Sequence, residues 1–217
     1  MPTVFESLIG VASAIQARMA GFEAHDEGYA FPWPNYVWRS PKFRRAHLDI
    51  VDVRETKKLY MLHLCIFPHV NDPSPVFGFD IIAGPSKVTG FFHDLSPIAG
   101  STDLDVWFKK QVQDAQWSRQ RELPDWAKAI FSGNMVAAGN VQDSTELEQL
   151  IALAMGTLDH YLSAIGTDAD GDYSQAQDRY CIHQKQNPHT PRVMQALGFN
   201  ESTVNSFINN CLFPELV

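Results

Sequence analysis

The stretch HLDIVDVRETKKLYMLHLCIF, residues 47–67, contains two runs of alternating apolar residues on either side of the polar turn ETKK. Two further runs of this kind, FGFDIIAG (77–84) and KVTGFFHDL (87–95), follow after turn residues. Successive side chains of a β-strand point to opposite faces, so a period of two predicts strands rather than helices. Because short turns join the successive runs, the sequence predicts an antiparallel meander.

Helical periodicity flanks this meander on both sides. Phe5, Leu8, Ile15 and Met19 are among the apolar residues that recur at helical spacing over residues 3–20. After the meander, the sequence predicts helices over residues 103–117, from Thr145 to the residue before Gly166, over 173–186, from Thr190 to Gly198, and around 204–212. Thr145 with Glu148 is expected to form a capping box, and Thr190 to cap the helix that begins with Pro191.

Three segments fall outside these patterns. FPWPNYVWRSPKF (31–43) is expected to be extended or irregular, QRELPDW (120–126) to be a loop, and AIFSGNMVAAG (129–139) to be a strand pair. The order helix, sheet, helices predicts one domain over residues 1–217, an α/β sandwich with a mostly antiparallel sheet.

Composition excludes several classes of protein. With 217 residues, 45% of them hydrophobic and 19% charged, the chain can form a sizeable core and is not disordered. No apolar run approaches the roughly 18 residues of a membrane span. The cysteines Cys65, Cys181 and Cys211 are odd in number and widely spaced, which favours a reducing cytoplasm over disulfides or a zinc site. A net charge of −8 argues against nucleic acid as the partner.

The charge is distributed unevenly along the chain. Residues 39–58 carry a net charge of +4, whereas residues 94–178 carry −9. A solvated hairpin rich in Lys and Arg explains the basic segment in structural terms, since charge runs are usually surface. Alternatively, the segment steers an acidic partner to the protein.

Four titratable residues can share one face of the predicted sheet. His47 and Asp49 are two apart on the first strand, and His63 and Asp80 lie on the next two strands. If Val53 pairs with Leu59, then Asp49 lies opposite His63, although a slip of one residue would scatter the group. Charged groups on a covered sheet face are costly unless they are paired or used, so the cluster is a candidate site. Each residue taken alone is more often a core or edge residue.

Other motifs are rejected. Asp168, Asp170 and Asp172 resemble a calcium loop, but the glycine and the final acid are misplaced, and no metal site is expected. A His/Asp hydrolase lacks a nucleophile elbow and metal-ligand spacing.

The sequence resembles the ferredoxin-dependent bilin reductases, within them most closely the phycocyanobilin:ferredoxin oxidoreductase branch and its short phage and marine relatives. The matching stretches, in order along residues 40–198, are SPKFRRAHLDIV, MLHLCIFP, PVFGFDIIAGP, HDLSP, QRELPDWAKAIFS and QKQNPHTPRVMQALG. This resemblance implies a three-layer α/β/α sandwich, a biliverdin substrate between the sheet and the C-terminal helices, no bound cofactor, and reduced ferredoxin as the donor of single electrons through bilin radicals. A monomer is also implied.

The resemblance also implies residue roles. Asp80 corresponds to the central proton-donating acid, and His63 and His47 correspond to its histidine partners. Arg121, with Thr89 nearby, corresponds to the site that holds a substrate propionate. Asn187 corresponds to the asparagine of the C-terminal helix motif, and Val193 is expected to contact the substrate. Protonation by a positioned acid of raised pKa agrees with such roles.

Two departures from the family pattern bear on the product. Phycocyanobilin-forming members have Glu where this chain has Asp49, and that Glu is tied to reduction of the ring D vinyl group. Pro188 stands where other branches place an acid. We therefore expect a four-electron reduction of biliverdin IXα through 15,16-dihydrobiliverdin to phycoerythrobilin, with phycocyanobilin as the alternative product. A bilin-binding carrier without catalysis is a second alternative.

Because ferredoxins are acidic, the basic segment is expected to contribute to docking. The residues expected at this surface are Arg44, Arg45, Lys57 and Lys58.

Overall fold

A seven-stranded antiparallel sheet forms the middle of the molecule, and its strands follow one another in chain order. The structure, a computed structural model, describes residues 2–166 and 169–216. The strands are β1 (Glu23–Ala24), β2 (Asn35–Ser40), β3 (Phe43–Val53), β4 (Leu59–Pro68), β5 (Val76–Ala83), β6 (Val88–Ser96) and β7 (Val136–Ala138). The four strands expected between residues 47 and 95 are confirmed as β3 to β6.

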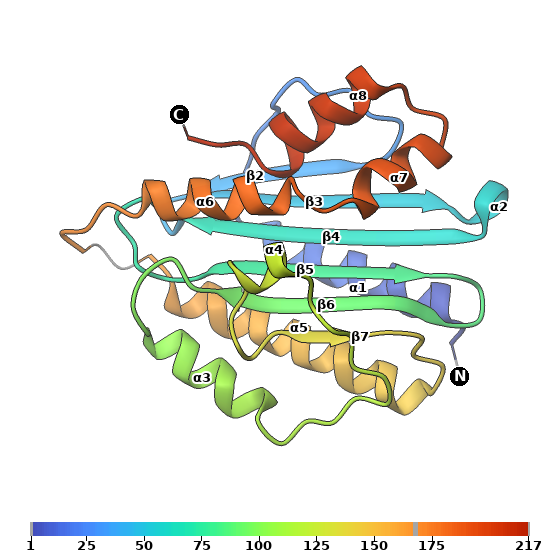
Figure 1. Ribbon diagram of the computed structural model, residues 1–217, viewed down its shortest axis with the longest axis horizontal. Helices are drawn as coiled ribbons and strands as arrows, with labels where there is room; N and C mark the ends of the chain where they lie inside the picture. Colours follow the sequence, from blue (N-terminus) through green and yellow to red (C-terminus); the bar gives the residue numbers. More distant parts are fainter. Residues whose placement is uncertain (1, 167–168, 217) are drawn as a thin grey trace.

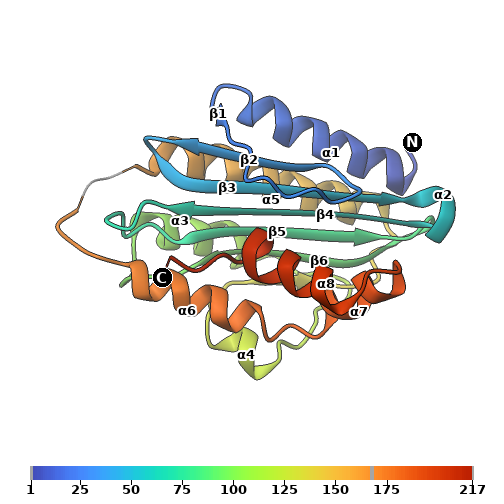
Figure 2. The same ribbon diagram turned by 90° about the horizontal axis from the view of Figure 1, so that it is seen from above.

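Helices cover both faces of the sheet, which makes the expected three-layer α/β/α sandwich (Figure 1, Figure 2). On one face lie α1 (Val4–Met19), α3 (Asp103–Val112) and α5 (Ser144–Ala164). On the other lie α6 (Ser174–Gln184), α7 (His189–Ala196), α8 (Glu201–Ser206) and the π-helix Phe207–Leu212. The short helix α2 (Arg54–Lys57) connects β3 to β4, and α4 (Asp125–Lys128), between α3 and β7 in the chain, packs on the same face as α6. In the described residues no helix is long and apolar enough to cross a bilayer.

The two faces have different cores because the strands alternate. Leu48, Leu62, Leu64 and Ile81 point toward α1, α3 and α5 and are fully buried in the larger hydrophobic cluster. The intervening residues point toward α6, α7, α8 and the π-helix, where the hydrophobic cluster is smaller. The titratable residues noted in the sequence lie on this second face.

Short helical turns replace two expected loops. The turn ETKK contains α2, and Lys58 closes it with a φ of 53°, in the left-handed region. The segment 120–126 was expected to be a loop, but Pro124 begins α4 inside it. The proline-rich segment 31–43 includes β2, which pairs with β3.

The prediction of a strand pair over residues 129–139 is wrong, because only Val136–Ala138 forms a strand. Ser132 donates both its backbone N–H (2.8 Å) and its hydroxyl to the Asp94 carboxylate. The Ser132 N–H that could pair with a neighbouring strand is thus bonded to Asp94 instead, which holds the segment away from the sheet.

Two predicted helix caps are also wrong. Asp143, not Thr145, caps α5, and its carboxylate accepts from Glu146 N at 2.8 Å. The α7 helix begins at His189, because the Asn187 side chain accepts from His189 N at 3.0 Å and starts the turn before Thr190. The helix predicted over 103–117 ends at Val112. The expected stops at Gly166 and Gly198 are confirmed, since both have positive φ.

Candidate active site

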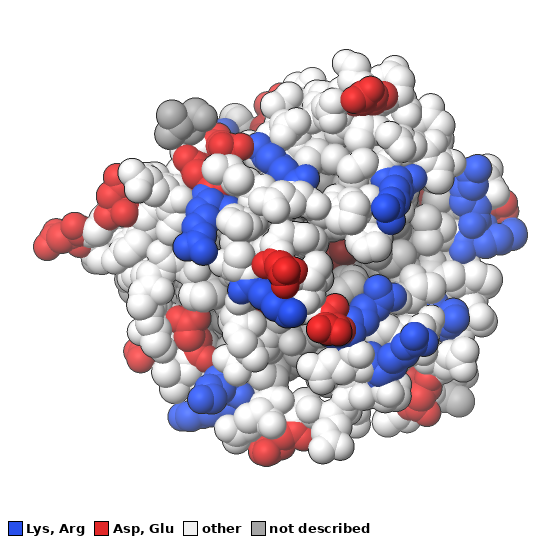
Figure 3. Space-filling view, viewed as in Figure 1, with Lys and Arg blue, Asp and Glu red and all other residues white. Residues whose placement is uncertain are grey.

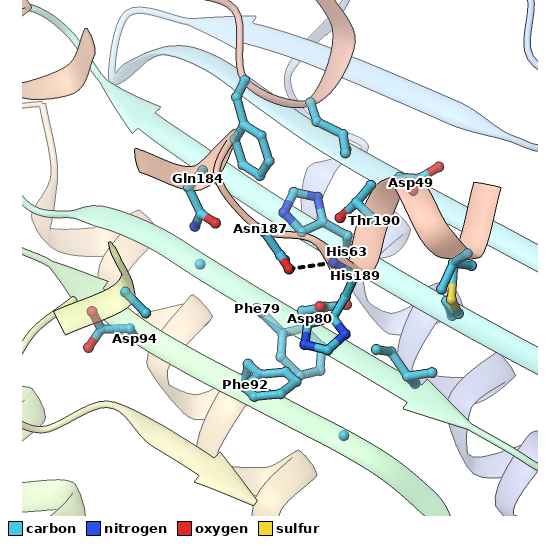
Figure 4. Close-up of a pocket in the computed structure, with 18 of the residues that line it drawn as sticks. Asp49, His63, Phe79, Asp80, Phe92, Asp94, Gln184, Asn187, His189 and Thr190 are labelled. Atoms are coloured by element: carbon cyan, nitrogen blue, oxygen red, sulfur yellow. Dashed lines mark hydrogen bonds between the residues drawn. The ribbon is translucent and has the colours of Figure 1, made fainter. Parts of the chain in front are cut away.

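Three titratable side chains form a row across the centre of the sheet. Asp49 on β3 lies directly opposite His63 on β4, and His63 lies directly opposite Asp80 on β5. Val53 pairs with Leu59, so the expected register is confirmed. Side chains directly opposite one another in an antiparallel pair lie on the same face, about 5 Å apart at Cβ. The row therefore brings two carboxyls to either side of one imidazole (Figure 4).

All three side chains line a cavity of about 400 Å³ between the sheet and the C-terminal helices. Small-molecule sites typically have volumes of roughly 300–1,000 Å³. Apolar side chains form most of the remaining wall, and they include Val51, Met61, Phe92, Trp126, Phe131, Met194, Leu197, Phe207, Leu212 and Phe213. Such a cavity suits a large, flat, mostly apolar ligand.

Burial changes the protonation of both carboxyls. The pKa of Asp49 is raised to about 8, chiefly by removal from water; the Trp33 indole opposes the shift in part, and the charge of Asp80 adds to it. Burial alone raises the pKa of Asp80 to about 7. A charged carboxylate is poorly solvated in an apolar cavity, so the neutral acid is favoured. Each acid can therefore hold a proton near neutral pH and give it to a ligand.

Burial acts in the opposite direction on the imidazoles. Burial, with a smaller contribution from the nearby positive charge of Arg45, lowers the pKa of His63 to about 4. The pKa of His47 falls well below its ordinary value for the same two reasons, with a smaller contribution from His63. Both rings are thus neutral at pH 7. A neutral His63 between Asp49 and Asp80 can accept a proton from one side and donate on the other.

His47 lies behind this row rather than in the cavity wall. Its Nε2 lies 2.9 Å from Asn35 Oδ1 and 3.5 Å from Cys211 Sγ, and its ring centre is 6.3 Å from that of His63. The π-helix covers His47, and its expected role as a second histidine partner of Asp80 stays a prediction. Any effect of His47 on a bound ligand would therefore act through His63.

Arg121 and Thr89, expected to bind a propionate, do lie together at the cavity wall. An Arg121 guanidinium N–H donates to the Thr89 carbonyl, and the guanidinium lies 5.5 Å from the Phe92 ring centre. Its side chain crosses Gly139, where an added Cβ would lie 2.5 Å from Arg121 Nε. The Thr89 hydroxyl donates to the Ile82 carbonyl at 3.1 Å. The exposed guanidinium keeps other N–H groups for an acidic ligand group.

Asn187 and Val193, the other two expected binding residues, also line the cavity. Asn187 lies between α6 and α7, and Val193 lies on α7. The Asn187 side-chain oxygen is taken by the His189 N–H, as Figure 4 shows. Its amide N–H groups are the ones left for a ligand.

Sequence analysis missed further polar residues in the wall. Asp94 on β6 pairs with Gly78 and therefore shares the face of Asp80. Burial raises the pKa of Asp94 to about 6, although hydrogen bonds from Ser132 and Ser96 oppose the shift. Gln184 donates to Tyr180 Oη at 2.8 Å. The HDLSP motif contains Asp94, and the alternation of β6 could have placed it on this face.

The structure corrects part of the expected docking surface. Arg45 is only 3% exposed, and it pairs with Glu27 at 2.7 Å and donates to the Cys211 carbonyl. Arg44 is half-buried, donates to Gln177 and lies over the Phe67 ring. Both side chains reach α6 or the π-helix on the same face of the sheet, because a register shift between Phe43 and Arg45 interrupts the alternation of β3 at Arg44. Only Lys57 and Lys58 of the expected set are exposed.

No cluster of three or more potential metal ligands occurs within residues 2–166 and 169–216. Asp168 of the rejected calcium loop lies outside the described residues.

The α/β/α sandwich thus combines an apolar cavity with two buried acids beneath it, an arrangement suited to a large ligand that must be protonated. The sequence family described as ferredoxin-dependent bilin reductase matches residues 3–214, and the chain belongs to this family. It is accordingly a ferredoxin-dependent bilin oxidoreductase.

Named relatives agree with this assignment. The chain is 30% identical over 200 residues to phycocyanobilin:ferredoxin oxidoreductase of Synechococcus sp. (strain CC9605), covering 84% of this chain and 77% of the relative. It is 30% identical over 213 residues to the protein of that name from Prochlorococcus marinus (strain MIT 9313), covering 93% and 78%.

Two solved structures have the same fold. The structure of PcyX is similar with a TM-score of 0.69 at 31% identity, covering 97% of this chain and 99% of that one. Tomato phytochromobilin synthase, solved in complex with biliverdin, has a TM-score of 0.72 at 13% identity, covering 96% and 82%.

Proposed function

We propose that this protein reduces biliverdin IXα to phycoerythrobilin through 15,16-dihydrobiliverdin, with four electrons from reduced ferredoxin and no bound cofactor. The observation that carries the proposal is the row of Asp49, His63 and Asp80 beneath the cavity. A bilin becomes more basic when it takes up an electron, so a protonated acid in contact with it completes each reduction. Asp80, at the centre of the sheet face, is the acid assigned to the 15,16 methine bridge.

The length of the side chain at position 49 supports this product over phycocyanobilin. Asp49 is only 6% exposed, and the backbone register with His63 fixes where its carboxyl can lie. A glutamate would extend the carboxyl by one methylene, about 1.5 Å farther into the cavity. Proton transfer requires hydrogen-bond distance, so a difference of this size decides which group is protonated. We assign Asp49 to support of His63 and Asp80 rather than to vinyl reduction.

Arg121 would hold a propionate at the rim, and Asn187 and Val193 would contact the ring system from the covering helices. This orientation leaves the propionates near solvent and the conjugated system over the acids. The Arg121 guanidinium suits a carboxylate, because its planar donors match the two oxygens.

Ferredoxin would dock on the face that carries the cavity. Figure 3 shows Lys and Arg side chains at the edge of this face and around a central hollow. The exposed cations contributed by elements at the cavity include Lys57, Lys58, Arg121, Lys128 and Arg192. An acidic iron–sulfur protein is attracted to such a rim, although the whole chain has a net charge of −8. Docking there brings the electron donor close to the bilin.

The test is to incubate the protein with biliverdin, reduced ferredoxin and a reducing system, and to identify the products by absorption and chromatography. Phycoerythrobilin preceded by 15,16-dihydrobiliverdin is expected. Phycocyanobilin as the product would overturn the product assignment. Binding of biliverdin without any spectral change under reducing conditions would overturn the catalytic proposal and favour a carrier.

A further inference from the structure

His189 is the first residue of α7, and its side chain lies in the cavity wall on the side facing the sheet. In Figure 4, which looks onto the sheet, the imidazole of His189 lies over Asp80. His189 comes from the covering layer and Asp80 from the sheet, and both line the same cavity. A flat ligand in the cavity would therefore have Asp80 on one face and His189 on the other.

The backbone at His189 is held in place before any ligand binds. Its N–H donates to the Asn187 side chain at 3.0 Å. Pro188 precedes it and Pro191 follows in the first turn, and each proline ring restricts its own φ. The backbone from which the His189 side chain projects is therefore preorganised.

His189 also differs in solvent access from the acids beneath the cavity. Asp49 and Asp80 lie on the covered sheet face, and burial is what keeps each in its neutral form. His189 is exposed, so its imidazole exchanges protons with water.

Other titratable residues of the wall are poorly suited to repeated proton delivery. His93 is fully buried, its Nδ1 lies 2.8 Å from the Gly78 carbonyl, and burial lowers its pKa to about 4. Glu122 has a side chain that is 93% exposed and lies 3.9 Å from Lys128, so it points outward. Asp94 accepts three hydrogen bonds from Ser96 and Ser132, which hold it to the wall. Burial raises the pKa of Tyr180 well above its ordinary value, so it keeps its proton.

A four-electron reduction consumes four protons, whereas the buried carboxyls of Asp49 and Asp80 hold only one each. We propose that His189 is a second, solvent-rechargeable proton donor that protonates the bilin on the face opposite Asp80. This inference rests on the proposed function and identifies one more catalytic residue for it.

Each two-electron reduction takes up two electrons and two protons. Two reduced ferredoxins give one electron each, the π component of one C=C bond breaks, and two C–H bonds form. One proton comes from a sheet-side carboxyl and the other from the His189 imidazolium, whose N–H bond breaks. The neutral imidazole regains a proton from solvent, and the carboxylate regains its proton from water when product leaves.

Charged and titratable groups surround His189 from several elements. Asp49, His63 and Asp80 face it across the cavity from the sheet, and Arg121 and Glu122 lie at the rim. Arg192 lies on the same helix. A pH profile would therefore mix several titrations, so chemical rescue is the sharper measurement.

The experiment compares wild type with His189→Gln, His189→Ala and the control His160→Gln. His160 stacks on Trp107 at 4.1 Å on the opposite side of the sheet, so its loss removes a histidine without touching the cavity. We expect the His189 variants to bind biliverdin as wild type does, judged by absorption titration. We expect them to complete the second reduction at least about tenfold more slowly and to accumulate the two-electron intermediate. Added imidazole should restore His189→Ala and leave wild type and His160→Gln unchanged.

Wild-type rates in both His189 variants would overturn the inference. Slow turnover without rescue by imidazole would also overturn it, in favour of a structural role for this residue. Neither result would contradict the proposed function, which fails only if the wild type itself does not reduce biliverdin.

Discussion

Asp80 lies directly opposite His63 in the antiparallel pairing of β5 with β4, and both side chains line the same cavity. One side chain is a carboxyl whose pKa burial raises to about 7, and the other is an imidazole whose pKa burial lowers to about 4. The pair is therefore favoured as a neutral acid beside a neutral base. This arrangement stores a transferable proton without placing an uncompensated charge under an apolar ligand.

Replacement of Asp80 by Asn tests the central proton donor. The amide has nearly the same shape but no acidic proton, so the cavity should still bind biliverdin. Turnover should fall by about 10²–10⁴, the usual contribution of a general acid. Stopped-flow absorption under reducing conditions measures the rate, and Asp114→Asn, which removes an exposed carboxylate, is the control. Near-normal turnover of Asp80→Asn would contradict the assignment.

Lengthening the acid at position 49 tests the choice of product. Asp49→Glu moves the carboxyl about 1.5 Å farther from β3. We expect part of the product to change from phycoerythrobilin to phycocyanobilin, because vinyl reduction then has an acid within reach. Chromatography of the product mixture measures the ratio. A product unchanged in identity, from a variant that still binds and turns over, would show that the length of residue 49 does not select the product.

Buried carboxyls should make folding stability fall as pH rises above about 6.5. Asp49 and Asp80 have pKa values raised from 3.8 to about 8 and about 7, so the folded state binds more protons than the unfolded state in this window. The lowered pKa of His63 acts oppositely, but only between about 4 and 6.5. Each carboxyl reduces the free energy of unfolding by up to about 1.4 kcal/mol per pH unit while it remains protonated in the folded state.

Urea unfolding at pH 6.5 and 7.5 measures this dependence. Asp49→Asn should have a smaller decline than wild type, whereas Asp114→Asn should keep the wild-type decline. An equal decline in all three proteins would show that Asp49 is ionised in the folded state.

Arg121 should contribute to substrate affinity through a propionate. Arg121→Gln should raise KM for biliverdin about tenfold and leave kcat nearly unchanged, because one charge-assisted pair at an exposed rim contributes about 1.4 kcal/mol at most. Biliverdin dimethyl ester supplies the matched control, since it lacks the carboxylates. With the ester, wild type and variant should have the same KM. A difference that persists with the ester would mean that Arg121 acts through packing on Phe92 instead.

Charge reversal at the edge of the cavity face should weaken coupling to ferredoxin. Lys57→Glu/Lys58→Glu should raise KM for ferredoxin severalfold, and the effect should shrink as salt rises. Lys109→Glu/Lys110→Glu on α3 makes the same change in net charge on the opposite layer and should have little effect. Equal effects of the two double variants would indicate attraction to net charge rather than to this surface.

The central sheet and its register could be predicted from the sequence because both depend on residues that are close together in the chain. Alternation over residues 47–95 specifies the faces of β3 to β6, and the register of β3 with β4 follows once the short connection pairs Val53 with Leu59. That pairing places Asp49 opposite His63. Covering both faces then requires the flanking amphipathic helices, so the layers follow from the same pattern.

Only the tertiary structure decided which of the polar residues reach the cavity. His47 and Arg45 lie on the same β3 strand as Asp49, yet the π-helix and Glu27 cover them. His189 comes from α7, and nothing in local periodicity links it to Asp80. Alternation gives the face of a strand residue but not what packs over it, and the pKa of a buried group depends on that covering. The sequence by itself therefore determined the strands, their register and the row of acids, whereas tertiary packing decided the depth of the cavity, the charge of its acids and the residues that roof it.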